Sequence, residues 1–313
     1  MRDTERPLDL EGEHAVTIGV YDGVHLGHQL VIRRTRELAT ERGLATALIT
    51  FDPHPATVIR PESAPKLLTG LEHKLELVAA QGIDTTVVVP FDAERAAEPA
   101  AEFVDELIVG ALKARVVVVG GNFHFGRGRE GTTELLAELG EKYGFEVHAL
   151  DLLEGANGGV QPVSSTAVRR ALERSDVTAA AQMLGRPFEI RGPVTEGDRR
   201  GRTIGFPTAN VAVPRPLALP ADGVYAGWYV RPDGQRWPTA VNVGKRPTFY
   251  DNAEHSLVEA HLIGFDGDLY GEAARVELLH HLRPEQRFDG IDALAAQLQR
   301  DIITALKLLG VSH

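Results

Sequence analysis

The chain has 313 residues, a formal net charge of −11 at pH 7 and no cysteine. The lack of cysteine excludes disulfides, thiolate zinc sites and cysteine nucleophiles, and the acidic balance argues against a nonspecific nucleic-acid binder. No apolar run approaches the ~18 residues of a membrane span, and the N-terminal segment has no apolar signal core. We therefore expect a cytoplasmic protein with neither a nucleic-acid nor a membrane partner, and leave open whether it forms a homo-oligomer.

The first half of the chain alternates between strand-like and helix-like patterns. Strands are predicted at 15–20, 45–51, 85–90, 116–120 and 146–150, and helices at 29–42, 72–81, 99–112 and 133–143. Continuous β-branched runs separated by helices indicate a parallel sheet that is covered on both faces. This pattern predicts a doubly wound α/β domain, in which ligands bind at the carboxyl ends of the strands.

The turn after the first predicted strand carries two histidines, His25 and His28, separated by Leu-Gly. A strand, a glycine-bearing turn and a helix N-terminus form an anion site, because free backbone N–H groups and the helix dipole point outward there. Gly27 would let the backbone approach a ligand, and the imidazoles can add donors to a bound phosphate. The string is short enough to occur by chance, but its context favours a phosphate site.

Three later segments could complete this site. His54 follows the second predicted strand in Asp-Pro-His-Pro, so it is expected at the same sheet edge, although a rigid turn with an exposed histidine is the better explanation of this motif taken alone. The glycine-rich segment 120–129 follows the fourth strand and suits a mobile loop that closes over phosphates. Hydroxyls at 164–166 open a further helix, where they can cap it or donate to a ligand.

The pattern of predicted elements changes near residue 185, from alternating strands and helices to short, closely spaced strands. Short strands are predicted at 188–194, 224–230, 239–243, 257–262 and 274–279, with Gly and Pro turns between them, and a helix is predicted at 291–309. Closely spaced strands with such turns indicate a small antiparallel β-barrel, here closed by the last helix. We therefore expect domains at 1–185 and 186–313, with a short connecting helix at 177–184.

Polar residues of the second half also suggest a phosphate and metal site. The glycine-rich run 192–205 can present N–H groups to phosphates, and the Thr208 hydroxyl and Asn210 amide oxygen are hard ligands of the kind Mg²⁺ prefers. Glu259 lies in a predicted strand, where a carboxylate is rare unless it is exposed or functional. Taken singly, the segment Pro207-Thr208-Ala209-Asn210 also fits a plain turn, and Glu259 is better explained as a solvent-facing residue of an alternating strand.

Combined, these motifs resemble two known families. Segments 19–28, 51–55, 122–126 and 164–169 resemble the FMN adenylyltransferase module of prokaryotic bifunctional FAD synthetases, a branch of the nucleotidyltransferase superfamily. Segments 205–210, 223–227, 242–249, 258–261 and 268–271 resemble riboflavin kinase in sequence and in order. The first resemblance spans most of residues 14–185 and the second runs from about 186 to the end.

The resemblance implies two consecutive reactions on small-molecule substrates. Riboflavin and ATP would give FMN in the C-terminal barrel, and FMN and a second ATP would give FAD and pyrophosphate in the N-terminal domain, with Mg²⁺ as cofactor. It implies catalytic roles for His25, His28, Arg169 and Glu259; nucleotide binding by Gly19, Asp22, Gly27, His54, Asn122, Ser164, Ser165, Thr166, Gly197, Gly201 and Gly205; flavin contacts for Phe125, Phe249 and Arg283; and Mg²⁺ ligation by Thr208 and Asn210.

Two alternatives remain open at this point. An adenylyltransferase for another phosphate acceptor would share the histidine motif but would leave the second domain unexplained. A non-catalytic flavin-binding sensor with the same fold would bind FMN or FAD without consuming ATP. A turnover assay separates the sensor from the enzyme.

Overall fold

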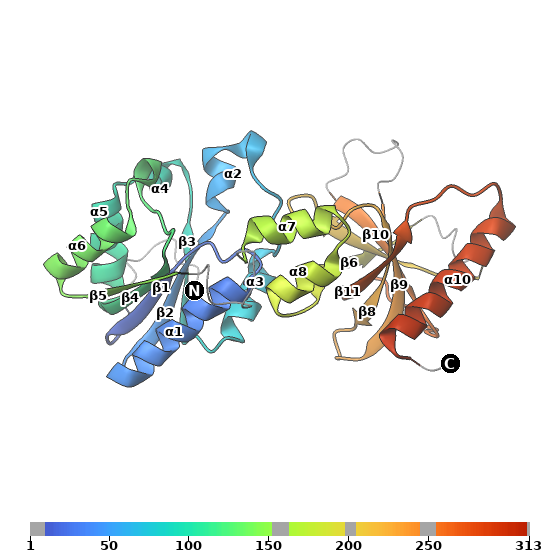
Figure 1. Ribbon diagram of the computed structural model, residues 1–313, viewed down its shortest axis with the longest axis horizontal. Coiled ribbons are helices and arrows are strands. Elements are labelled where there is room, and N and C mark those ends of the chain that lie inside the picture. Colours follow the sequence, from blue (N-terminus) through green and yellow to red (C-terminus); the bar gives the residue numbers. More distant parts are fainter. Residues whose placement is uncertain (1–9, 152–162, 198–204, 245–254, 312–313) are drawn as a thin grey trace. The chain divides into compact units, whose positions relative to one another are not determined.

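The chain folds into two compact units, Met1–Ser165 and Thr166–His313. The computed structural model describes residues 10–151, 163–197, 205–244 and 255–311 (Figure 1). Gly201 and Phe249, for which nucleotide and flavin contacts are expected, lie outside the described residues. None of the helices in these ranges is both long enough and apolar enough to cross a membrane.

The first unit is built on a five-stranded sheet with the order β3-β2-β1-β4-β5. The strands are β1 (His14–Ile18), β2 (Ala45–Asp52), β3 (Thr85–Pro90), β4 (Ala114–Gly120) and β5 (Glu146–Leu150). Every neighbouring pair in this sheet is parallel, as expected. The chain runs from β1 to β2 and β3 on one side and then crosses to β4 on the other. Ligands of such sheets bind at this switch point, outside the carboxyl ends of β1 and β4.

Helices cover both faces of the sheet, because side chains along a strand alternate between faces. The helices are α1 (Leu26–Arg42), α2 (Pro55–Ile59), α3 (Leu71–Ala79), α4 (Ala93–Ala97), α5 (Ala100–Phe103) and α6 (Thr133–Tyr143), with the π-helix η2 (Val104–Ala111) and 3₁₀ turns η1 (Pro61–Ser63) and η3 (Arg127–Arg129). Val16 and Ile18 pack with α5, η2 and α6, whereas Ala15 packs with α1. The doubly wound α/β prediction is confirmed.

Helix α1 begins earlier than its apolar periodicity predicts. The sequence predicts a start at residue 29, but the helix begins at Leu26 because the His25 side chain accepts a hydrogen bond from a first-turn amide and caps it. The helix ends at Gly43, whose left-handed backbone (φ 66°) directs its N–H to the carbonyl of Ala39. The histidine turn is therefore part of the helix N-terminus.

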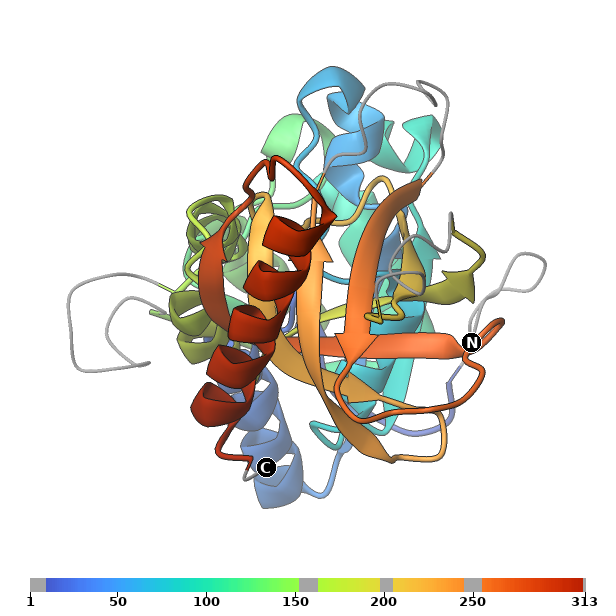
Figure 2. The same cartoon turned by 90° about the vertical axis from the view of Figure 1, so that its right-hand side faces the viewer.

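The second unit is a closed six-stranded barrel with the order β10-β7-β6-β11-β8-β9. The strands are β6 (Phe188–Thr195), β7 (Ala209–Pro214), β8 (Gly223–Val230), β9 (Arg236–Val243), β10 (His255–Leu262) and β11 (Ala273–Pro284), preceded by α7 (Ser165–Glu173) and α8 (Val177–Leu184) and followed by α10 (Ile291–Leu309). Figure 2 shows α10 lying across the barrel, where it contacts β8, β9 and β11. The predicted barrel with a closing helix is confirmed.

Strand β7 is an addition to the sequence prediction, which treated its first residues as a turn. It pairs with β10 from Ala209 to Pro214 and with β6 at Asn210 and Val211. Its preceding Gly-Phe-Pro segment hides the strand pattern, because Gly and Pro are typical of turns. Asn210 is therefore held on a strand rather than in a flexible loop.

Helices α7 and α8 pack within the barrel unit. Helix α8 contacts β6 and β11, and the Thr178 hydroxyl donates to the carbonyl of Leu279 at 3.4 Å. The amide of Ala221 likewise donates to the carbonyl of Leu172, at the end of α7, at 3.0 Å. The two compact units consequently divide between Ser165 and Thr166, earlier in the chain than the boundary expected between residues 185 and 186.

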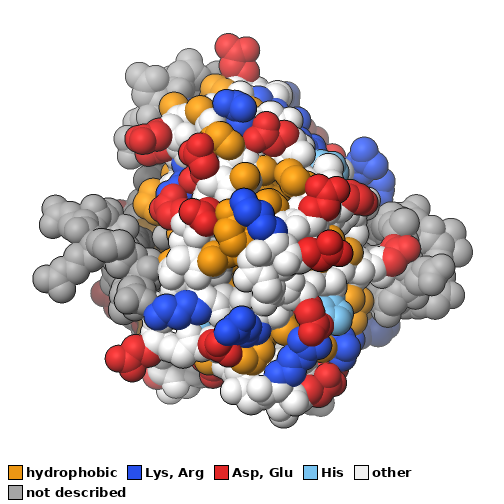
Figure 3. All heavy atoms as spheres, turned by 90° about the vertical axis from the view of Figure 1, so that its left-hand side faces the viewer, with side chains coloured by type: hydrophobic (Ala, Val, Ile, Leu, Met, Phe, Trp, Pro, Cys, Tyr) orange, Lys and Arg blue, Asp and Glu red, His pale blue; other side chains and the backbone are white. Residues whose placement is uncertain are grey.

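One face of the molecule is seen as spheres in Figure 3. Acidic and basic side chains are interspersed on this face, with small groups of hydrophobic side chains between them. The mixture fits the composition, in which 44 acidic residues exceed 33 basic residues without forming long runs of one sign.

Candidate active sites

The turn between β1 and α1 has a strained backbone that neighbouring groups hold in place. Tyr21 and Val24 both have positive φ, 54° and 39°, which non-glycine residues rarely adopt and which β-branched valine adopts least of all. Such a residue costs of order 1–3 kcal/mol and persists only where its surroundings fix it. Here Val24 donates its amide to the carbonyl of Tyr21, and Gln29 donates its side-chain amide to the carbonyl of Val24.

The carboxylate of Asp22 fastens this turn to the segment before α3. Its Oδ1 accepts the amides of Leu68 at 2.8 Å and Thr69 at 3.2 Å, while the Thr69 hydroxyl accepts the amide of Gly23 at 3.1 Å. Ser165 adds a bond from its hydroxyl to the backbone carbonyl of Asp22 at 2.9 Å. The structure therefore gives Asp22 a positioning role, and its nucleotide contact stays a prediction.

The first histidine of the turn is oriented by its own capping bond. His25 is buried, and its Nδ1 accepts the amide of His28 at 3.3 Å. A ring nitrogen that accepts a hydrogen bond carries no proton, so the neutral His25 ring carries its proton on Nε2. The ring can therefore act as a donor only through Nε2–H. A Cβ on Gly27 would lie 3.2 Å from this ring, which explains the glycine beside it.

The second histidine is kept neutral by its surroundings. The rings of His25 and His28 stack with centroids 3.6 Å apart, and the Tyr21 ring lies 5.0 Å from His28. Burial lowers the pKa of His28 well below its usual value, and His25 and Lys74 lower this pKa further. Its Nδ1 is buried and has no hydrogen-bond partner among the described residues. This nitrogen is thus a polar atom without a partner at the helix N-terminus.

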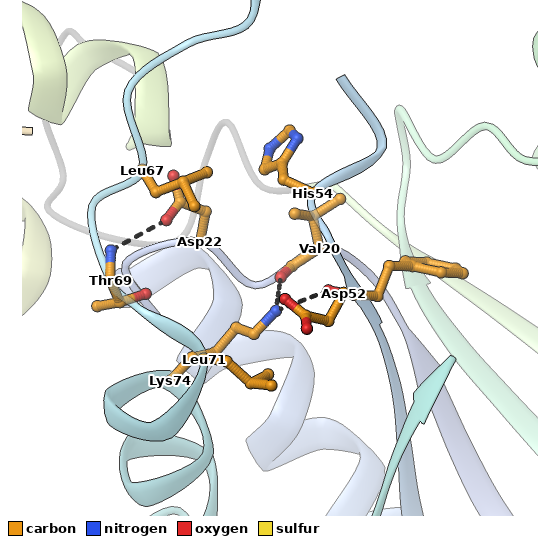
Figure 4. Close-up of a pocket in the computed structure, with 9 residues that line it drawn as sticks. Val20, Asp22, Asp52, His54, Leu67, Thr69, Leu71 and Lys74 are labelled. Carbon is orange, nitrogen blue, oxygen red and sulfur yellow. Dashed lines mark hydrogen bonds between the residues drawn. The ribbon is translucent and has the colours of Figure 1, made fainter. Parts of the chain in front are cut away.

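His54 repeats the pattern at the end of β2, beside β1 in the sheet. It follows the cis peptide Asp52–Pro53 and caps α2, its Nδ1 accepting the amide of Ala56 at 3.0 Å. Its neutral ring therefore also carries the proton on Nε2. His54 and Asp22 are among the residues that line a small pocket at the ends of β1 and β2 (Figure 4). The expectation that His54 shares a sheet edge with the other histidines is confirmed by the strand order.

Lys74, on α3, is a residue that the motif analysis missed. Its side chain is buried, and Nζ donates to the Thr50 hydroxyl at 3.0 Å and to the carbonyls of Phe51 at 3.1 Å and Val20 at 3.3 Å. A signal existed in the sequence, because Lys74 is four residues before the buried Val78 and so lies on the apolar face of the helix. Lysine is almost never fully buried unless it is paired.

The loop after β4 is packed against its neighbours. Phe125 is buried, with the Phe123 ring stacked on it at 5.4 Å, and it exchanges both backbone hydrogen bonds with Gly131. Gly126 (φ 70°) abuts Ala100, where a Cβ would come within 2.7 Å. These contacts fix the base of the loop that was expected to be mobile. Asn122 is exposed, Phe125 is a core residue, and their ligand contacts stay predictions.

The structure also describes the positions of Gly19, Ser164, Thr166 and Arg169, which are expected to bind ATP. A Cβ on Gly19 would lie 3.0 Å from the Tyr21 ring, and the Gly19 amide donates to the carbonyl of Ile49. Ser164 precedes α7, whereas Thr166 and Arg169 lie on α7 within the second unit. Their contacts with ATP stay predictions.

In the barrel, Asn210 and Glu259 form a cross-strand pair. Glu259 on β10 is opposite Asn210 on β7 and, on its other side, opposite Asn242 on β9. Directly opposed residues of antiparallel strands share a face of the sheet. Val258, the neighbour of Glu259, is fully buried on the other face, whereas Glu259 is half-buried. The sequence placed Glu259 and Asn210 in one site but gave no role to Asn242.

The Asn210 side chain is suited to hold a cation. It is buried, and its Oδ1 has no hydrogen-bond partner among the residues that the structure describes. A Cβ on Gly197 would overlap the Asn210 amide, so only glycine fits there. An unpartnered buried amide oxygen is costly unless a ligand completes it, and amide and hydroxyl oxygens are donors that Mg²⁺ accepts.

His261 holds the segment that precedes Asn210. Its Nδ1 lies 2.7 Å from the carbonyl oxygen of Pro207, so the ring donates from a protonated Nδ1. The Phe206 ring meets the His261 ring edge-on, with centroids 5.8 Å apart. The next residue, Thr208, is thereby placed beside the strand that carries Glu259. Gly205 (φ 85°) precedes this segment and is exposed.

Arg283 has a structural partner in this unit. Its guanidinium donates from Nε and Nη2 to the carboxylate of Asp301 on α10, at 2.8 to 3.0 Å, and Gln297 adds a further bond to that carboxylate. Both members of the pair are largely buried. Arg283 therefore ties α10 to β11, and its flavin contact stays a prediction.

Comparison with known proteins assigns each unit separately. The model of the FAD synthetase family matches residues 9–167, and the model of the riboflavin kinase family matches residues 184–309. Curated proteins called bifunctional riboflavin kinase/FMN adenylyltransferase are 39% identical over 297 residues in Escherichia coli K12, covering 95% of this chain and 93% of that protein, and 35% identical over 300 residues in Bacillus subtilis, covering 95% and 93%. The chain belongs to this bifunctional family.

A solved structure supports the architecture over both units. A crystal structure described as a macrolide-efflux protein from Streptococcus pneumoniae has a TM-score of 0.82 and 30% identity, covering 97% of this chain and 95% of that one. A relative from Pseudomonas fluorescens is 39% identical over 307 residues, covering 97% of this chain and 96% of that protein. Both the histidine turn and the Asn210–Glu259 pair thus lie inside regions shared with this family.

Proposed function

We propose that this family member makes FMN in its barrel and converts FMN to FAD in its α/β unit, using one ATP in each step. The observation that carries the proposal is the tandem match of two family models, FAD synthetase over residues 9–167 and riboflavin kinase over residues 184–309. Riboflavin, FMN and ATP are then the substrates. The residue roles below are part of this proposal, and the geometry of the described residues is given where it supports them.

In the adenylyl step, a phosphate oxygen of FMN attacks the α-phosphorus of ATP, and the bond to the leaving pyrophosphate breaks. The attacking oxygen is already an anion, so no general base is required. The protein must position the phosphates and stabilise the charge that develops on the leaving group. The N-terminus of α1 supplies free amides and the positive end of the helix dipole for this purpose.

The histidines would act on the triphosphate in this step. His25 can donate from Nε2, because its Nδ1 is already used by the backbone of α1. His28 is neutral before ATP arrives, and the added negative charge of ATP would raise its pKa and strengthen its hydrogen bond. Arg169 and the hydroxyls at 164–166 would assist at the phosphates, with His54 and Asn122 in contact with the nucleotide.

In the kinase step, Glu259 would accept the proton of the ribityl 5′-hydroxyl while that oxygen attacks the γ-phosphorus of ATP. The bond between the γ-phosphorus and the bridging oxygen then breaks, and ADP leaves. Asn210 lies directly opposite Glu259 in the strand register, and His261 holds the backbone next to Thr208. General base catalysis of this kind contributes about 10²–10⁴-fold.

Thr208 and Asn210 would hold Mg²⁺ in the kinase site. The Oδ1 of Asn210, which is buried and has no partner among the described residues, and the hydroxyl of Thr208 fit its preference for oxygen ligands. When bound, Mg²⁺ neutralises charge on the phosphate oxygens of ATP. Chelation with EDTA should therefore abolish FMN formation, and added Mg²⁺ should restore it.

The direct test is a time course of the purified protein with riboflavin, ATP and Mg²⁺, with the flavins separated by chromatography. The proposal predicts that FMN appears first and FAD follows. A lack of any new flavin would refute the enzyme assignment and leave flavin binding without turnover. FMN that accumulates without FAD, even when FMN and fresh ATP are supplied, would refute the adenylyl assignment alone.

Two variants separate the sites. His28→Ala should lose FAD formation and keep FMN formation. Glu259→Gln keeps the shape of the side chain but removes its basicity, so riboflavin phosphorylation should fall by about 10²–10⁴-fold while FAD formation from supplied FMN continues. A parallel loss of both activities in either folded variant would contradict two separate sites.

A further inference from the structure

The buried ammonium of Lys74 has no part in the chemistry described so far. Only 6% of this residue is exposed, although it lies on α3 close to the ends of two central strands. Replacing a buried ionic group with an apolar one of similar size is often neutral or stabilising. A lysine at such a position therefore calls for a reason other than stability.

The three hydrogens of the ammonium have three acceptors on two strand ends. Nζ donates to the carbonyl of Val20, after β1, and to the hydroxyl of Thr50 and carbonyl of Phe51, on β2. The Thr50 hydroxyl in turn donates to the carbonyl of Val20 at 3.0 Å. Lys74, Thr50 and Val20 thus form a closed set of hydrogen bonds. Figure 4 shows Lys74 reaching up from α3 towards Val20 and Asp52.

The acceptors lie directly before the two histidine-bearing turns. Val20 is followed by the turn that contains His25 and His28, and Phe51 is followed by the turn that contains His54. Asp22 and Asp52 favour the charged form of Lys74 against the cost of its burial, which by itself lowers the pKa of the lysine. One cation thereby fixes the starting points of both turns.

We propose that Lys74 is a positioning residue for adenylyl transfer, whose ammonium holds the histidine turns of β1 and β2 in the arrangement that receives the ATP phosphates. The proposal rests on the proposed function of the α/β unit. Lys74 itself touches neither substrate. It acts through His25, His28 and His54, and its loss displaces groups that must match the transition state.

The positive charge of Lys74 has a second, measurable consequence at His28. The groups that face His28 are Tyr21 and His25 from its own turn and Lys74 from α3. Lys74 contributes to the lowered pKa of His28, because two like charges close together disfavour each other. Removing the ammonium should therefore raise the pKa of His28 towards its ordinary value.

The test uses the full-length protein with Lys74→Met, which keeps the unbranched stem and removes the ammonium. The kcat of FAD formation from FMN should fall on the order of 10²-fold, as expected when reacting groups are misplaced by about 1 Å. The KM values for FMN and ATP and the rate of riboflavin phosphorylation should stay unchanged. Lys142→Met, at an exposed lysine of α6, is the matched control and should behave as the parent protein.

NMR titration of His28 provides a readout independent of activity. Its pKa should rise in Lys74→Met and stay unchanged in Lys142→Met. A folded Lys74→Met protein with the parent kcat would overturn the proposal. So would a loss that lies entirely in KM with an unmoved His28 titration, since that would indicate weaker binding rather than misplaced histidines.

Two further variants distinguish a failure of the Lys74 proposal from a folding defect and from a failure of the proposed adenylyl site. If Lys74→Met does not fold, Thr50→Val removes the hydroxyl shared by Lys74 and Val20 at nearly constant shape, and its kcat should fall in the same way; an unchanged kcat there would overturn the proposal. His28→Ala is measured in parallel. If it retains FAD formation, the proposed function of this site fails, whereas loss in His28→Ala with none in Lys74→Met refutes the role of Lys74 alone.

Discussion

His25 and His54 each have a structural role beside the chemical role proposed for them. Each uses Nδ1 to cap a helix, α1 or α2, and each is left with a proton on Nε2. The same hydrogen bond that begins the helix therefore sets the tautomer of the ring. An aspartate would cap equally well but would offer no donor on its far side.

Substitutions at His25 should separate these two roles. His25→Asn keeps a good capping residue and removes the distal donor, so stability should hold while FAD formation falls about 10²–10³-fold, the usual effect of losing one such donor. His25→Ala should lose the same activity and also about 0.5–2 kcal/mol of stability. Chemical denaturation and FAD formation from FMN measure the two effects. Undiminished FAD formation in His25→Asn would exclude the donor role.

Gly197 lies so close to the side chain of Asn210 that a Cβ on residue 197 would overlap it. The Asn210 amide occupies the space that a Cβ would take. Gly197→Ala should displace Asn210 and lower riboflavin phosphorylation by at least about 10-fold, while FAD formation from FMN stays unchanged. Gly290→Ala is the matched control in the same unit, because no atom lies within 4 Å of its added Cβ. Equal kinase rates for the two variants would count against the contact.

At the scale of elements, the barrel site depends on the register of three strands. Asn210 on β7, Glu259 on β10 and Asn242 on β9 align across the sheet. A shift of one residue in any of these pairings would turn a member of the row to the other face. His261, two residues beyond Glu259 on the same face, then holds the approach to β7 through Pro207.

Replacement of His261 by the two amide side chains should test this contact. The amide nitrogen of asparagine occupies the place of Nδ1, whereas that of glutamine lies near the place of Nε2. His261→Asn should therefore keep the bond to Pro207 and most kinase activity, while His261→Gln should lose about 10-fold or more and require more Mg²⁺. Riboflavin phosphorylation against Mg²⁺ concentration is the measurement. Identical curves for both variants would rule out a role for the Nδ1 bond.

At the scale of the molecule, the two family models match separate parts of the chain. Each unit has its own buried core and its own family match. We therefore expect that FMN made by one molecule can be used by another. Two variants, each defective in one of the two reactions, can therefore be mixed to test whether FMN passes between molecules.

A mixture of His28→Ala and Glu259→Gln should form FAD from riboflavin although neither variant does so efficiently alone. The first variant supplies FMN, and the second adenylylates it after FMN diffuses between molecules. Chromatography of the mixture and of each variant separately gives the comparison. If the mixture makes no more FAD than the separate variants, an intact pair of sites within one chain is required.

The sequence predicted most elements because their patterns are local. β-branched runs marked the strands of the sheet, and their alternation with helices marked the parallel order. It missed β7 because Gly and Pro precede that strand, and it began α1 late because a histidine cap is not a common start signal. Its prediction that segment 120–129 forms a mobile loop stays a prediction, and it gave no sign that Gly126 and Phe125 are packed against residues far from them in the chain.

The motifs alone determined the family, the two reactions and the positions of the histidine turn and the barrel site, because these depend on residue types at fixed spacing. Only the tertiary structure decided that Asp22 holds a turn, that Arg283 ties down α10, and that Lys74 lies beneath both histidine turns. These roles depend on which strand ends meet at a sheet edge and which side chains are buried there. Such contacts join residues distant in the chain, and no local pattern encodes them.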